Sequence, residues 1–154
     1  MESMDIAKNF ELLTVKDNQT AYRALQVLRE MSEKTDLVYA YMDKLGEMLD
    51  SPNSYVRTRG LILIACNAKW DVEFKIDELI DKYLTHITDK KPITARQCIK
   101  CLPVIAKSKP QLREDIIAVL NHADVSIYAD SMQPLVYKDI HESLQMLQSD
   151  VSSI

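Results

Sequence analysis

Residues 49–57 read Leu49-Asp50-Ser51-Pro52-Asn53-Ser54-Tyr55-Val56-Arg57. This stretch predicts the end of one helix and the start of the next, because Pro52 cannot continue a helix interior and Asn53 can cap the helix that follows. The pattern around it recurs, and Leu45, Asp50, Val56, Arg57 and Leu63 correspond to Leu84, Asp89, Ala95, Arg96 and Leu102. The two arginines lie 39 residues apart (96 − 57). A period of this size, with helical patterning inside each unit, predicts a stack of helix pairs.

The apolar periodicity predicts eight helices joined by short turns. Their expected ranges are 4–14, 20–32, 36–49, 55–68, 72–87, 93–107, 110–121 and 132–148, followed by a fraying tail at 149–154. Only two glycines and five prolines are present, which is too few for a fold built on tight hairpins. Short turns also force neighbouring helices to run antiparallel. We therefore predict an all-α chain, a short α-α superhelix of about four antiparallel helix pairs, as a single domain over residues 1–154.

Three local features refine this prediction. Asp17 or Asn18 can cap the second helix, and Asp71 can cap the fifth, because their side-chain oxygens accept the free amide protons of a first turn. Gly60 lies inside the fourth helix, where glycine costs about 1 kcal/mol against alanine. We therefore expect Gly60 to permit a close crossing with another helix.

The charge balance argues against several classes of partner. The chain has 19 basic and 23 acidic residues, a net charge of −4, whereas a nucleic-acid surface needs clustered Lys and Arg. No apolar run approaches the roughly 20 residues that span a bilayer. The N-terminus is acidic and lacks an export signal, and three cysteines indicate no disulfide framework. We expect a cytoplasmic protein that binds neither membrane nor nucleic acid.

The stretch at 49–57 resembles the HEAT-repeat family of armadillo-type helical repeats. That pattern has an apolar first helix, a turn with Asp and Pro, and Val-Arg at the start of a second apolar helix. The unit from Tyr83 to Ile105 matches it through Asp89, Pro92 and Arg96. The first pair matches loosely through residues 17–23, and the last pair, from residue 110, has no matching arginine. The resemblance implies a helical solenoid that binds other proteins.

The resemblance also implies a role for the repeated residues. In HEAT repeats, the turn aspartate and the arginine of the second helix make hydrogen bonds that link successive repeats. This role, with at least partial burial, is implied for Asp50, Arg57, Asp89 and Arg96. A guanidinium group suits it, because its planar fork of donors can satisfy turn carbonyls and a carboxylate together. The alternative is an exposed row of arginines that binds an acidic peptide or phosphate.

A narrower likeness covers the whole layout, including residues 67–71 and 130–135. It is to a group of small bacterial HEAT-like proteins of unassigned function, some of which carry a label tying them to the Suf iron–sulfur assembly scaffold. The core of that scaffold is a β-helix, and this sequence contains no strand repeats. No residue of the chain supports the label.

Cys98 and Cys101 form a Cys-x-x-Cys within a predicted helix, with both sulfur atoms on one face. A zinc site normally needs four ligands, and no second cysteine pair or group of histidines completes one. The three histidines are isolated in the sequence. We expect these cysteines to be small buried apolar residues. The sequence thus predicts no metal, cofactor or catalytic residue, and the protein is not expected to be an enzyme.

The leading functional hypothesis is a non-catalytic protein–protein interaction or scaffold module whose second helices form an inner layer. Its partner would be a protein or peptide. Polar residues of that layer are the possible contacts: Thr58, Arg59, Gln97, Lys100, Lys107, Gln133 and Lys138. The alternative hypothesis is nucleic-acid binding or DNA repair, because HEAT-like glycosylases that excise alkylated bases use the same stack of helices. Those enzymes are longer and basic, unlike this chain.

Overall fold

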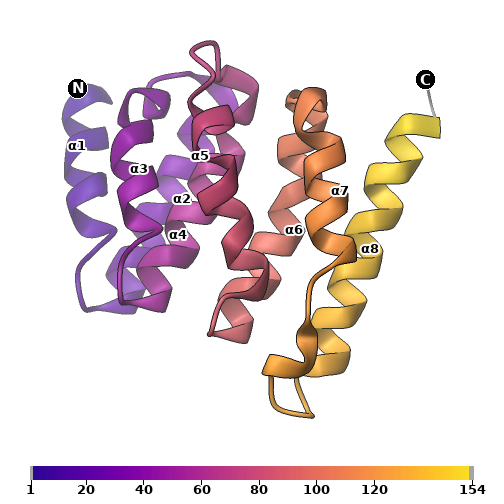
Figure 1. Ribbon diagram of the computed structural model, residues 1–154. Coiled ribbons are helices and arrows are strands. Elements are labelled where there is room, and N and C mark those ends of the chain that lie inside the picture. The colour runs from indigo at the N-terminus through magenta and orange to yellow at the C-terminus, as the bar shows by residue number, and fades with distance from the viewer. Residues whose placement is uncertain (1, 153–154) are drawn as a thin grey trace. The chain divides into compact units, whose positions relative to one another are not determined.

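The computed structural model describes residues 2–152 and the side chains of residues 5–149. All regular structure in this range is helical (Figure 1), which confirms the all-α prediction. The α-helices are α1 (Glu2–Leu12), α2 (Asn18–Lys34), α3 (Met42–Met48), α4 (Ser54–Cys66), α5 (Lys75–Leu84), α6 (Pro92–Ser108), α7 (Arg113–Asn121) and α8 (Gln133–Ser152). Short 3-10 turns join them: η1 (Val38–Tyr41), η2 (Ala68–Trp70), η3 (Thr85–Thr88), η4 (Pro110–Leu112) and η5 (Val125–Ile127).

Three helix boundaries differ from the sequence prediction. The helix expected at 36–49 divides into η1 and α3. The helix expected at 72–87 begins only at Lys75, because Phe74 has a φ of 57°, a left-handed conformation that an α-helix cannot contain. At the other end, α8 continues to Ser152, so the helix extends into the tail that was expected to fray. Residues 153–154 of that tail lie outside the described range.

Two of the expected helix caps are present. Asp17 accepts a hydrogen bond from the amide of Gln19 at 3.2 Å and so caps α2. Asp71 accepts from the amides of Lys75 at 2.9 Å and Ile76 at 3.0 Å, at the start of α5. The Tyr39 hydroxyl also donates to Asp71, at 2.5 Å. Asp71 therefore both caps α5 and ties it to η1, which the sequence did not predict.

The chain divides into two compact units, Met1–Ile76 and Asp77–Ile154. In the first unit, α2 packs on α1 and α4, and α3 packs on α4. The side chains of Asn18 and Arg59 meet at 3.1 Å, and those of Ser32 and Asn67 also meet at 3.1 Å. Early residues of α2 thus pair with the middle of α4, and late residues with its end. This order makes α2 and α4 parallel neighbours.

The second unit has the same arrangement in its own helices. α6 packs on α7 and α8, and α7 packs on α8. Arg96 of α6 donates to Asp139 of α8 at 2.6 Å, and Ser143 of α8 donates to the carbonyl oxygen of Ile99 at 2.7 Å. The contacts advance together along both helices, so α6 and α8 run parallel. The expectation of one domain over residues 1–154 remains a prediction.

Gly60 lies where α4 crosses α3, as the sequence predicted. A Cβ atom built on Gly60 would stand 3.1 Å from the Cβ of Met48 and 3.2 Å from the carbonyl oxygen of Leu45. Both distances are shorter than ordinary van der Waals contact, and one of the atoms belongs to the backbone. Glycine at this position therefore allows the two helices to approach.

We predict that Gly60→Ala lowers the free energy of unfolding by about 1–3 kcal/mol, because the added methyl group forces α3 and α4 apart. Helix propensity alone predicts the opposite, a gain of about 1 kcal/mol. Urea unfolding followed by circular dichroism measures whether the free energy of unfolding falls or rises. A variant as stable as the native chain would contradict the close crossing.

Candidate functional site

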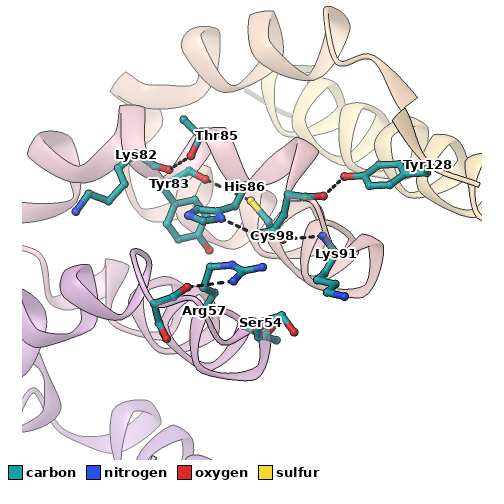
Figure 2. Close-up of polar contacts among 12 residues, drawn as sticks. Ser54, Arg57, Lys82, Tyr83, Thr85, His86, Lys91, Cys98 and Tyr128 are labelled. Carbon is teal, nitrogen blue, oxygen red and sulfur yellow. Dashed lines mark hydrogen bonds and ion pairs between the residues drawn. The ribbon is translucent and has the colours of Figure 1, made fainter. Parts of the chain in front are cut away.

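Asp89 is the centre of a buried polar network at the start of α6. Figure 2 labels three residues that bond to it, His86, Lys91 and Tyr128. One carboxylate oxygen lies 2.7 Å from Nδ1 of His86, and the other accepts from the amide of Lys91 at 2.9 Å. The Asp89 carbonyl oxygen accepts from the Tyr128 hydroxyl at 2.5 Å. Asp89 thus joins the turn before α6 to the segment before α8. Its burial agrees with the role that the HEAT resemblance implies.

The same network constrains His86 and Tyr128. A carboxylate only accepts hydrogen bonds, so Nδ1 of His86 carries the proton that points to Asp89. Burial, followed by the charge of Asp89, raises the pKa of Tyr128 to about 12. Both groups are therefore occupied in structural contacts and buried, which leaves them poorly placed to act on a substrate.

Arg96 joins α6 to α8 through a residue that the sequence prediction missed. Its Nε donates to Asp139 at 2.6 Å, and the Asp139 side chain is only 3% exposed while that of Arg96 is 28% exposed. The hydrogen bond that Arg96 donates to Asp139 raises the pKa of Arg96. Asp139 lies in the last pair, which carries no arginine of its own in the repeat pattern. This pair could be identified only from the tertiary structure, because Arg96 and Asp139 are 43 positions apart in the sequence.

The first copy of the repeat pattern differs from the second. Arg57 is 4% exposed, and one guanidinium nitrogen donates to the carbonyl oxygen of Ser51 at 3.1 Å, which ties α4 to the turn before it. Asp50, in contrast, is exposed. The expectation of a partly buried Asp50 is therefore wrong. Asn53 caps α4, as the sequence predicted, by accepting from the amide of Tyr55 at 2.9 Å.

The possible partner contacts fall into exposed and enclosed groups. Lys100 and Lys107 of α6 and Lys138 of α8 are exposed. Thr58, Gln97 and Gln133 are half-buried. Thr58 donates to the carbonyl oxygen of Ser54 at 2.8 Å, and Gln133 donates to that of Tyr128 at 2.8 Å. The three lysines are thus the members of this set that are most available to a partner.

Arg59 does not form part of an exposed surface. It is 6% exposed, and its guanidinium donates to the carbonyl oxygen of Leu13 at 2.8 Å and to Oδ1 of Asn18 at 3.1 Å. Burial lowers the pKa of Arg59. Its expected role as a partner contact is replaced by a structural one, in which it links α4 to the turn between α1 and α2. The sequence could not show this, because the contacts span more than 40 residues.

The exposed face of α6 is the clearest candidate surface. Ile93 is 70% exposed and Val104 is 50% exposed, and Gln97, Lys100 and Lys107 share their helical face at spacings of three and four. Neither lysine forms an ion pair with a described residue. The helix contains three basic residues, Arg96 included, and no acidic ones. This face, which we call the α6 face, combines apolar area with positive charge.

The cysteines do not gather into a reactive or metal-binding site within the described residues. Cys98 is fully buried and its sulfur lies 3.6 Å from the carbonyl oxygen of Tyr83 (Figure 2). Burial raises the pKa of the Cys98 thiol well above its usual value, and also raises that of Cys66. Across the described residues, no group of three or more His, Cys, Asp and Glu side chains could hold a metal ion.

Comparisons with protein-family models, curated proteins and solved structures gave no match to this chain. No helix in the described part of the chain combines the length and apolar character that a membrane span requires.

We predict that Arg57→Ala lowers the free energy of unfolding by about 1–3 kcal/mol, because the change removes a buried side chain and leaves the part-buried carbonyl oxygen of Ser51 without its donor. Arg23→Ala is the matched control, since Arg23 is exposed on α2, and surface changes of this kind cost about 0.5 kcal/mol or less. Thermal unfolding of both variants measures the difference. Equal melting temperatures for Arg57→Ala and Arg23→Ala would contradict the structural role of Arg57.

We also predict that Cys98 resists alkylation by iodoacetamide at pH 8, because its thiol is buried and stays protonated. Mass spectrometry after labelling of the folded protein should find Cys98 unmodified, and labelling in guanidinium should modify all three cysteines. Rapid modification of Cys98 in the folded state would contradict a purely structural role.

Proposed function

We propose that the chain is a helical-repeat protein of the HEAT type, a short superhelix of about four helix pairs that binds a protein or peptide partner and catalyses no reaction. Two relationships support the repeat architecture. α2 runs parallel to α4 in the first unit, and α6 runs parallel to α8 in the second. Stacked helix pairs place each second helix beside the next in this way.

The observation that carries the binding function is the α6 face. Ile93 and Val104 expose large apolar side chains, and Lys100 and Lys107 stand beside them on the same face. Apolar side chains supply the area that a partner can bury, and the lysine charges favour a partner surface of opposite charge. We therefore propose that the partner presents an acidic and apolar surface to α6. Lys138 on α8 is a further possible contact.

A cytoplasmic location forms part of the proposal. All three cysteines are free thiols, and a reducing compartment keeps thiols in that state.

The alternative hypothesis, nucleic-acid binding, would use the same three basic residues of α6. It predicts affinity for duplex DNA that falls steeply as salt increases. A gel-shift assay at low salt separates the alternatives. Tight binding that is lost in Lys100→Glu/Lys107→Glu would favour nucleic acid over an acidic protein surface.

We predict that Lys100→Glu/Lys107→Glu removes specific proteins from those captured by the tagged chain in cells that express it. Lys8→Glu/Lys34→Glu is the matched control, because it changes the net charge equally at exposed positions on α1 and α2. Quantitative mass spectrometry compares both variants with the native chain. If all three recover the same proteins in the same amounts, the α6 face is not the binding surface.

A further inference from the structure

A cavity of about 540 Å³ lies at the C-terminal ends of α5 and α7, entirely within the second unit. Its walls are mainly apolar and are formed by Leu84, Ile87, Ala118, Val119, Ala123 and Ile127. Ile127 is 55% exposed at the surface of the protein. A volume in this range is typical of ligand pockets and exceeds that of any single side chain. The cavity belongs to the first helices of the pairs, on elements other than the α6 face.

Two polar groups stand at the edge of this cavity. Nδ1 of His122 lies 2.7 Å from the carbonyl oxygen of Ala118, so Nδ1 carries a proton and donates to that oxygen. The Asp124 carboxylate accepts from the amide of Ser126 at 3.0 Å and from its hydroxyl at 2.6 Å. These hydrogen bonds lower the pKa of Asp124, so the group is ionised at neutral pH. The edge thus offers a fixed negative charge.

α5 and the segment that leads into α7 also meet away from the cavity, and we call the surface between the two helices the groove. Asp77 pairs with Lys109 and accepts from Gln111 at 3.2 Å, and Gln111 lies 34 residues after Asp77. Leu84 of α5 and Ala118 of α7 both line the cavity, at the opposite ends of these helices. Because the two helices meet near their N-terminal ends and again at their C-terminal ends, they run parallel.

Asp81 of α5 and Asp115 of α7 both lie on the N-terminal side of the cavity. Each precedes a cavity residue of its own helix by three positions, which puts it on the same face about one turn away. Both are exposed, and neither forms an ion pair with a described residue. Acidic side chains therefore lie on both sides of the apolar cavity, Asp81 and Asp115 on one side and Asp124 on the other.

We propose that this groove binds a short basic peptide segment, with a large apolar side chain in the cavity and flanking Lys or Arg residues beside Asp81, Asp115 and Asp124. Charge complementarity selects this occupant. Residues 110–132 contain four acidic residues and one basic residue, which repels nucleic acid and acidic peptides. Acidic groups before and after an apolar cavity match a peptide segment that carries basic residues on both sides of an apolar one.

The test uses fluorescein-labelled peptides in which one Leu, Phe or Trp is flanked by two lysines on each side. A second set carries glutamate in place of lysine. Fluorescence anisotropy at low and high salt should show that the basic set binds the full chain, more tightly as the apolar side chain grows. Added salt should weaken this binding, because the flanking charges are exposed. The acidic set should not bind at the groove.

Two variants locate the peptide. Ala118→Leu fills the cavity with a good helix former and should weaken binding by about tenfold or more. Asp81→Asn/Asp115→Asn should weaken it by about fivefold and reduce its salt dependence. The matched control is Glu78→Gln/Glu114→Gln, which removes the same charge from exposed positions of the same helices that do not line the cavity. The control should bind as the native chain does.

The outcomes separate this proposal from the one for the α6 face. Failure of every basic peptide to bind would overturn the groove proposal, as would equal binding by the native chain, Ala118→Leu and Asp81→Asn/Asp115→Asn. Loss of basic-peptide binding in Lys100→Glu/Lys107→Glu alone would also overturn it, by moving the peptide to α6. None of these results bears on the capture of acidic partners by the α6 face.

Discussion

Every helix end in this protein must find partners for backbone groups that the helix itself leaves unbonded. Side chains from neighbouring elements supply many of them. Arg59 satisfies the Leu13 carbonyl at the end of the first helix, Asp71 satisfies two amides at the start of α5, and Tyr128 satisfies the carbonyl of Asp89. Because the contacts of Arg59 and Tyr128 join segments that are distant in the sequence, meeting the local requirement also fixes how the elements of one unit align.

The same requirement explains why the buried charged residues are poor candidates for binding. A buried guanidinium or carboxylate is costly unless its hydrogen bonds are complete. Arg59, Asp89 and Asp139 are therefore committed to internal partners. The groups proposed for binding are exposed instead: the lysines and apolar side chains of the α6 face, and the acidic groups around the cavity between α5 and α7. These two surfaces have opposite charge, so the partners proposed for them differ in chemistry.

The sequence predicted the helices well and their contacts incompletely. Asp17 and Asp71 could be identified as caps because capping acts over a few residues. The close crossing at Gly60 could be predicted because glycine destabilises a helix interior, so its presence there indicates a packing requirement. The start of α5 was placed too early, since the left-handed backbone at Phe74 has no signature in the sequence. Asp139 and the cavity were missed, because residues 43 positions apart or on two separate helices show no common pattern along the chain.

The sequence by itself determined the all-helical character, the turns and the caps, because apolar periodicity and turn chemistry act between neighbours in the chain. The tertiary structure decided which members of the repeat pattern are enclosed. Asp50 and Asp89 occupy equivalent positions in the repeat, yet Asp50 is exposed and Asp89 is buried. Likewise Arg59 is enclosed, whereas Lys100 on α6 faces solvent. Burial depends on which helix packs over a residue, and that neighbour comes from a distant part of the chain.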